Sequence, residues 1–121
     1  MEAFRKTYAT KNTPNIEIFK EQIKAYEEFL MVSGMELGEQ MMNDFDFLLC
    51  VGEIFTIIAY GQLIIESAAM ENIDDDLLDQ IFDFMVRDFA AYGLELNSKP
   101  SSNEKQQTAC MKMIKRPNAD M

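Results

Sequence analysis

The chain has 121 residues, of which 48% are hydrophobic, and its 21 acidic and 11 basic side chains give a formal net charge of −10. A chain of this length and apolar content suits one globular domain, and its negative charge argues against nucleic acid and anionic membranes as partners because both are polyanions. The absence of histidine excludes the usual general base at neutral pH, Ser-His and Cys-His nucleophiles, and imidazole metal sites.

The chain is expected to begin with a flexible segment or linker over residues 1–12, which lack the apolar run of a secretory signal. A helical bundle domain is predicted over residues 13–117. Its first helix starts at Thr13 and Pro14, which suit an N-cap and a first turn, and is expected to end before Gly34. Apolar residues recur within it at helical spacing, namely Ile16, Phe19, Ile23, Tyr26 and Leu30.

The second helix is predicted from about Asn43 to Met70 and is apolar on nearly all sides, which is typical of the central helix of a bundle. Two glycines within it, Gly52 and Gly61, each lower helix propensity by about 1 kcal/mol relative to alanine. We therefore expect a neighbouring helix to approach closely at these glycines and at Ala59.

This apolar segment also raises the question of a membrane span, because residues 47–65 contain one charged residue and approach the length of a bilayer crossing. The flanks of the segment are acidic and carry no Lys or Arg bias, and Glu53 would lie within the hydrocarbon. The sequence therefore favours a buried central helix over a span.

A third helix is predicted to start at Asp74, an N-cap, and to run to about Leu96. Ser101 followed by Glu104 forms a capping-box pattern for a fourth helix, which should reach Lys115. This helix has few large apolar groups and is the weakest of the four. The buried stripe of the third helix is predicted to comprise Leu78, Ile81, Phe82, Met85, Phe89, Tyr92 and Leu96.

The predicted fold class is all-α, an antiparallel bundle of about four helices with a long central apolar helix. Its charge is unevenly distributed: residues 36–95 hold fourteen acids and one base, whereas residues 96–121 have a net charge of +3. Basic residues near the C-terminus are expected to hold the fourth helix against the Asp-rich third helix, or to dock it on a partner. These residues are Lys105, Lys112, Lys115 and Arg116.

Acidic residues in the chain do not form a recognisable catalytic or metal-binding pattern. The cluster of Asp74, Asp75, Asp76 and Asp79 lacks the glycine and glutamate spacing of an EF-hand, which favours capping and solubility. Glu53 and Glu66 fall on roughly opposed faces of one helix and cannot act as a carboxylate pair. Glu53 is expected to point to solvent or to pair with a Lys or Arg, in preference to a catalytic role.

Sulfur-containing residues favour structural roles. Cys50 and Cys110 form no disulfide framework and are interpreted as reduced thiols of an intracellular protein. Ten methionines are many for this length, and core filling is favoured over an adaptable binding surface. The six considered for such a surface are Met41, Met42, Met70, Met85, Met111 and Met113.

Three segments, IAYGQLIIE, VRDFAAYGLELNSKPSS and MKMIKRP, resemble the extreme C-terminal helical region of large bacterial and archaeal acyl-CoA dehydrogenase-like flavoproteins. The resemblance covers about two thirds of the chain and consists of structural signatures. It implies that the flavin site, the acyl-CoA site and the catalytic glutamate lie in preceding domains. It also implies that residues 118–121 are a truncated tail, since the family's polypeptide continues further.

The resemblance implies a non-catalytic C-terminal domain that serves packing between domains or subunits in the cytoplasm. It carries over no catalytic, cofactor-binding or metal-binding residue, and FAD is implied only for a parent enzyme. The expected partners are other domains or subunits of that flavoprotein, or a second copy of the chain, with no nucleic acid and no membrane. The expected contact residues are Gly52, Phe55, Tyr60 and Gly61.

Three alternatives remain open at the level of sequence. The first is a free-standing acidic helical module for protein–protein interaction. The second is an enzyme domain that itself binds flavin or acyl-CoA, and the third is membrane attachment through the second helix.

Overall fold

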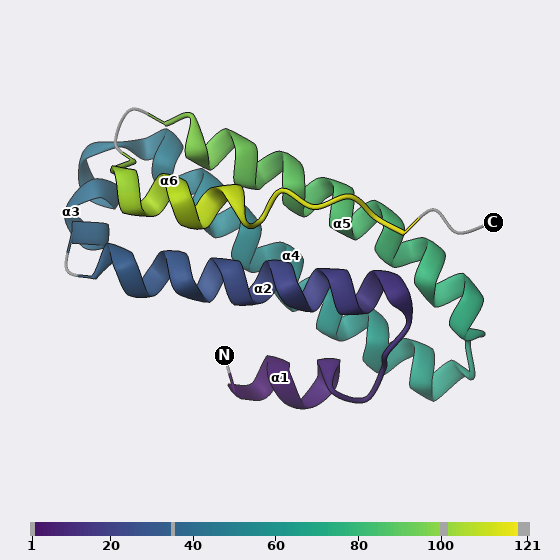
Figure 1. Cartoon of the computed structure of the whole chain (residues 1–121). Coiled ribbons are helices and arrows are strands. Elements are labelled where there is room, and N and C mark those ends of the chain that lie inside the picture. Colours follow the sequence, from purple (N-terminus) through teal and green to yellow (C-terminus); the bar gives the residue numbers. More distant parts are fainter. Residues whose placement is uncertain (1, 35, 100–101, 119–121) are drawn as a thin grey trace.

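The computed structural model describes residues 2–34, 36–99 and 102–118, and every regular element within these ranges is a helix. The helices are α1 (Glu2–Tyr8), α2 (Pro14–Ser33), α3 (Glu36–Asn43), α4 (Phe45–Glu71), α5 (Asp75–Asn97) and α6 (Glu104–Met111). The predicted all-α bundle with one long apolar helix is confirmed, and α1 and α3 are present in addition to the four expected helices. The helices α4 and α5 form an antiparallel hairpin, and α2 and α6 pack beside α5 (Figure 1).

Local sequence signals explain where the three long helices begin and end. Pro14 lies in the first turn of α2, although the hydroxyl of Thr13 makes no capping hydrogen bond. Gly34 ends α2 with a φ of 51°, a backbone conformation that glycine adopts without steric cost. The carboxylates of Asp44 and Asp74 cap α4 and α5 by accepting hydrogen bonds from backbone N–H groups. The predicted cap at Asp74 is therefore confirmed.

The start of α6 differs from the predicted capping box. Ser101 lies outside the described residues, and the N-cap of α6 is Asn103, which forms a reciprocal capping box with Gln106. The helix ends at Met111, earlier than the predicted end at Lys115. The last turn expected as helix is instead an irregular segment that continues along α2.

Phe19 of α2 lies at the centre of an aromatic cluster in the core. Its ring meets the rings of Phe82 and Phe89 edge to face, with centroid distances of 5.2 and 5.3 Å. The ring of Tyr8 lies 5.7 Å from Phe19. All four side chains are buried, so this cluster joins α1, α2 and α5 through apolar burial and aromatic pairing.

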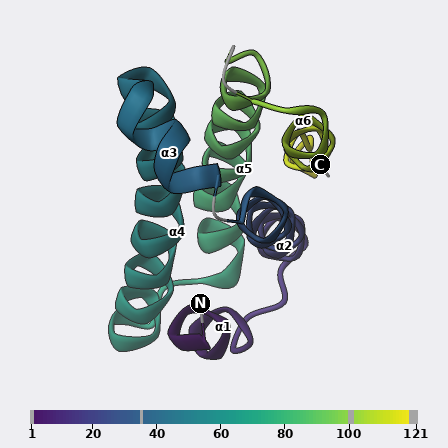
Figure 2. The same ribbon diagram turned by 90° about the vertical axis from the view of Figure 1, so that its left-hand side faces the viewer.

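The sequence predicted that the long helix α4 would be buried on all sides, and the structure shows that it is not. It lies at the edge of the bundle, and α5 takes the central place between α4 and the pair α2 and α6 (Figure 2). One face of α4 is buried, and its core residues are Phe47, Cys50, Val51, Ile54, Ile58, Gly61, Ile65 and Ala68. The opposite face remains exposed because the helices that mainly contact α4, namely α5, α1 and α3, do not cover it.

Helix α1 occupies part of the segment expected to be flexible or a linker. Tyr8 is buried, and its hydroxyl donates a hydrogen bond of 2.6 Å to the carbonyl oxygen of Ile58. The ring of Phe4 packs edge to face on Phe55 at 5.7 Å. Because a seven-residue helix is marginal in isolation, these contacts with α4 account for its presence.

Buried amide side chains align α2 with α5. The side-chain amide of Asn15 donates to the carbonyl of Asp79 at 3.1 Å, and the side-chain amide of Gln22 donates to the carbonyl of Val86 at 3.0 Å. Both pairs are separated by 64 positions. A constant separation means that α2 and α5 run parallel to each other in a fixed register.

The same amides hold the C-terminal segment along α2 in the opposite direction. Gln106 donates to the hydroxyl of Ser33, Gln22 donates to the carbonyl of Met113 at 2.9 Å, and Asn118 donates its N–H to the side chain of Asn15. Because buried polar groups are costly unless they are paired, these bonds specify the position of a segment that offers little apolar surface.

Glycine substitutions should separate an internal close approach from an open surface. A Cβ at Gly61 would overlap the hydroxyl of Tyr8, whereas a Cβ at Gly52 meets no atom within 4 Å. We expect Gly61→Ala to lower the free energy of unfolding by about 1–3 kcal/mol through overpacking. Gly52→Ala should raise it by up to about 1 kcal/mol because alanine favours a helix. Urea denaturation followed by circular dichroism measures both, and equal changes would contradict this assignment.

Candidate interaction surface

The four residues predicted to mediate association separate into two groups. Gly52, Phe55 and Tyr60 are exposed, whereas Gly61 is buried beneath Tyr8. The expected close approach at Gly61 is therefore present, but it comes from the chain's own α1. At Gly52 the expected neighbouring helix is missing from the described part of the chain.

The exposed side of α4 carries a second apolar stripe, which we call the outer face. Among its residues, Phe45 is 69% exposed, Leu63 is 59% exposed and Met70 is 84% exposed. Large exposed apolar side chains along one side of a helix are uncommon on the surface of a monomer. The outer face comprises Phe45, Leu48, Leu49, Gly52, Phe55, Tyr60, Leu63 and Met70.

The sequence contained the signal for the outer face, but in an ambiguous form. From Phe45 to Phe55 its residues recur at the three- and four-residue spacing of a helix, with Thr56 and Ser67 interrupting the row further on, and the buried stripe of α4 has the same helical spacing. A helix with apolar residues on both sides is predicted to be central in the bundle. The pattern is the same whether its second side contacts the same chain or another molecule. Only the arrangement of the other helices distinguishes these cases.

The charged residues that α4 itself places at the border of the outer face are all acidic, and at one of them, Glu66, Lys6 of α1 lies alongside. Asp46, Glu53, Glu66 and Glu71 lie on α4, which contains no Lys or Arg. Arg87 is the single base of residues 36–95, and its guanidinium pairs with Asp83 at 2.6 Å. The hairpin of α4 and α5 therefore presents a negative surface around an apolar centre.

Glu53 was expected either to point to solvent or to pair with a Lys or Arg. It is exposed, and it lies beside Tyr92 of α5. Partial burial, together with the charge of Glu53 and the hydrogen bond that its carboxylate accepts, raises the pKa of Tyr92. Glu53 thus connects α4 to α5 at the border of the outer face.

The basic residues expected to dock the last helix take other partners. Lys112 lies 3.0 Å from Glu28, and Lys115 lies 3.8 Å from Glu21. Both acids belong to α2, whereas the predicted partner was the Asp-rich helix α5. The difference arises because the C-terminal segment runs along α2. Lys105 and Arg116, the other two residues of this group, are exposed.

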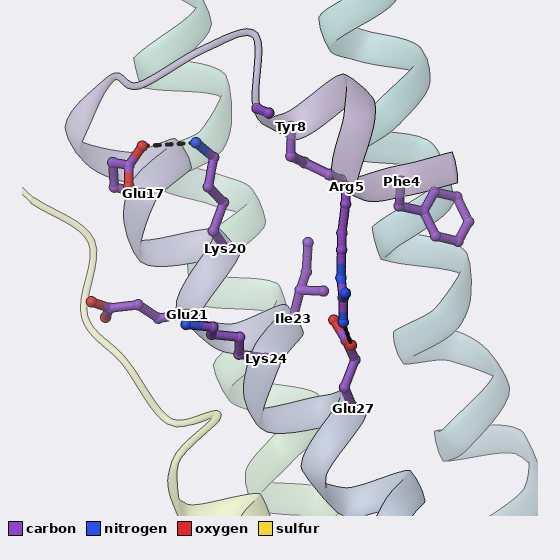
Figure 3. Close-up of a pocket in the computed structure, with 10 residues that line it drawn as sticks. Phe4, Arg5, Tyr8, Glu17, Lys20, Glu21, Ile23, Lys24 and Glu27 are labelled. Carbon is purple, nitrogen blue, oxygen red and sulfur yellow. Dashed lines mark hydrogen bonds and ion pairs between the residues drawn. The ribbon is translucent and has the colours of Figure 1, made fainter. Parts of the chain in front are cut away.

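A groove of about 430 Å³ lies between α1 and α2 (Figure 3). Arg5 reaches from α1 to form an ion pair with Glu27 of α2, and Lys20 lies 2.8 Å from Glu17. Lys24 and Glu21 add one further charge of each sign to the lining. The charges of this groove therefore balance, and the pair of Arg5 with Glu27 helps to hold α1 on α2.

The acidic cluster at the start of α5 caps this helix and joins it to the residues around the start of α2. Asp74 caps the helix, Asp75 pairs with Lys11 at 2.8 Å, and Asp79 accepts hydrogen bonds from Asn15. Within the described residues, no three His, Cys, Asp or Glu side chains are grouped as metal ligands would be.

The two cysteines are buried free thiols. Burial raises the pKa of Cys50 and of Cys110 to about 12 in each case. The thiol of Cys50 donates a 3.4 Å hydrogen bond to the carbonyl of Tyr92. Since the thiolate is the reactive form, both side chains have the environment of structural cysteines.

Methionines occupy both the core and the surface. Met85 and Met113 are buried, as core filling predicts, whereas Met42, Met70 and Met111 are exposed. The side chain of Met41 lies outside the described residues. Met70 is at the C-terminal end of the outer face, and Met42 precedes its N-terminal end by three residues.

By length and composition alone, α4 is the one helix in the described ranges that could cross a membrane. Of its most apolar stretch of 18 residues, 33% are buried inside the protein. Length and composition are weak evidence, because a core helix of a soluble protein meets the same criteria.

Comparisons with family models, with curated proteins and with solved structures found no match for this chain.

Proposed function

We propose that this protein is a non-catalytic helical association module that binds a protein partner through the outer face of α4. One observation carries the proposal: a helix of 27 residues has a buried apolar stripe on one side and an exposed apolar stripe on the other. Covering the second stripe would remove large side chains from water, at about 25 cal/mol for each Å² of apolar surface before entropic costs.

The sequence resemblance suggests the setting in which such a module would act. In an acyl-CoA dehydrogenase-like flavoprotein, the partner would be another domain or subunit of the same enzyme, which would supply the FAD site and the catalytic base. The proposal assigns neither role to this chain. Gly52 has no Cβ, so the backbone of α4 is exposed between Leu49 and Phe55. This supports close approach of a partner at that point.

Polar substitutions on the outer face test the proposed function. The double variant Leu49→Gln/Leu63→Gln removes two exposed anchors without changing charge, and Leu94→Gln is a matched control because Leu94 of α5 is 56% exposed. The probes are self-association, measured by sedimentation velocity, and a synthetic amphipathic helix with leucines on one side and glutamines on the other, measured by fluorescence anisotropy.

The double variant is expected to weaken whichever association the wild type shows by about tenfold or more, since buried anchors dominate an interface. Leu94→Gln should leave it unchanged. The proposal is wrong if the wild type neither self-associates nor binds the peptide, or if the double variant and the control behave alike.

A further inference from the structure

We infer that the partner of the outer face is a basic amphipathic helix, one with an apolar side flanked by Lys or Arg residues; this inference rests on the proposed function. The dimensions of the site fit such a partner. From Phe45 to Met70 the outer face runs along about 40 Å of α4, at 1.5 Å of rise per residue. An amphipathic helix can lay one apolar side along such a row at three- and four-residue spacing.

Charge around the outer face selects the sign of the partner. Each acid of α4 is at its border, and neither Lys nor Arg occurs in this helix. The neighbouring helix α5 adds Asp88 and Glu95, both exposed. The only base in this part of the chain, Arg87, is already paired with Asp83. A partner with Lys or Arg beside its apolar side would meet complementary charge along the border that Glu53 shares with α5, whereas at the other border Glu66 lies beside Lys6 of α1.

The same charge disfavours a second copy of the chain. An isologous contact would bring two hairpins together whose residues 36–95 each hold fourteen acids and one base. Like charges at that border repel one another, and burial would strengthen the repulsion because screening by salt decreases. An anionic lipid surface is disfavoured for the same reason.

Flexible exposed side chains on α4 and on the preceding helix α3 suit a helical ligand. Met42 and Met70 are each more than four-fifths exposed, at 88% and 84%. The unbranched thioether side chain adapts to irregular apolar shapes and is common on surfaces that accept helices. Met70, at the C-terminal end of the row, allows the contact to adapt where an incoming helix begins or ends.

Three synthetic helices with identical leucine sides and different polar sides test this inference. Their polar sides consist of lysine, glutamine or glutamate, and binding to the full chain is measured by fluorescence anisotropy at low and high salt. The lysine peptide should bind at least about tenfold more tightly than the glutamine peptide at low salt. This advantage should fall as salt is added, and the glutamate peptide should bind most weakly.

Charge-neutralising variants provide the matched comparison. Glu53→Gln/Glu66→Gln removes two border charges and should weaken binding of the lysine peptide by about threefold or more, while binding of the glutamine peptide stays the same. Glu104→Gln, at an exposed acid of α6, should change neither.

Equal binding of the lysine and glutamine peptides, both abolished by Leu49→Gln/Leu63→Gln, would overturn the inference and leave the proposed function standing. Self-association without peptide binding would also overturn it, and would identify a second copy as the partner. Vesicles of phosphatidylcholine or phosphatidylglycerol are the lipid control. Binding of the chain to these vesicles, without self-association or peptide binding, would overturn both the inference and the proposed protein partner.

Discussion

Replacing Gln22 with glutamate is expected to lower the free energy of unfolding at pH 7 by about 3–5 kcal/mol, the cost of a buried charge without a partner. Gln22 is fully buried, and its amide nitrogen donates to the carbonyls of Val86 and Met113 at 3.0 and 2.9 Å. A carboxylate at this position would place an anion against two acceptors. The C-terminal segment after α6 should be the first part released.

The stability lost through Gln22→Glu should increase as the pH rises. Burial disfavours the anion and raises the carboxyl pKa in the folded state above its unfolded value of about 4.3. The variant should therefore be closest to the wild type below that value and should lose stability as pH rises through the raised pKa. Urea denaturation of both proteins from acid to neutral pH gives the difference at each pH.

Gln22→Leu is the matched control for charge. It removes the donor without adding an anion, so it should cost about 1–3 kcal/mol, the penalty for an unsatisfied buried carbonyl. Its difference from the wild type should not change with pH. A glutamate variant that behaves like the leucine variant at every pH would show that the site is hydrated rather than buried.

Phe19→Ala is expected to lower the free energy of unfolding by about 3–5 kcal/mol, the range for truncating a buried phenylalanine. The ring of Phe19 is fully buried and contacts Phe82, Phe89 and Tyr8 with centroid distances of 5.2, 5.3 and 5.7 Å. Its loss would leave a cavity where α1, α2 and α5 meet. Thermal and urea denaturation followed by circular dichroism measure the change.

Phe84→Ala is the control for this substitution, because Phe84 of α5 is 70% exposed. Its free energy of unfolding should lie within about 0.5 kcal/mol of the wild type, as for most surface positions. Similar losses at Phe19 and Phe84 would mean that the bundle packs differently from the arrangement described above.

Periodicity in the sequence predicted the three long helices because each carries a continuous apolar stripe. Capping chemistry also predicted the start of α5 at Asp74 and the end of α2 at Gly34. These features depend on neighbours within one or two helical turns. They can therefore be derived without knowing the tertiary arrangement.

The short helices could not be predicted in the same way, because distant contacts stabilise them. Helix α1 depends on Tyr8, which packs beside Gly61. Helix α3 follows a glycine and contains another, a pattern that predicts a loop. Within it, Gln40 exchanges hydrogen bonds of 2.9 and 2.7 Å with Gln106 of α6. Neither partner can be identified from local sequence.

The candidate site was predicted in part. Phe55 and Tyr60 were expected as contact residues and are exposed on α4. The full row was missed because a helix that is apolar on both sides was interpreted as enclosed. The sequence shows which residues of α4 are acidic. It does not show that these residues surround an exposed face, because that depends on α4 lying at the edge of the bundle.

The hydrogen bonds between Asn15 and Asn118, residues 103 positions apart, have a consequence for biosynthesis. During translation, α2 leaves the ribosome long before the segment that covers its buried amides. Asp79 and Val86 emerge first and can pair with Asn15 and Gln22. The hydrogen bonds of these two amides to Asn118 and Met113 must wait, and until then water or a chaperone takes their place. Long-range contacts of this kind slow folding because a large loop must close first. The nascent chain should therefore acquire its complete structure late, after nearly all of this segment has been synthesised.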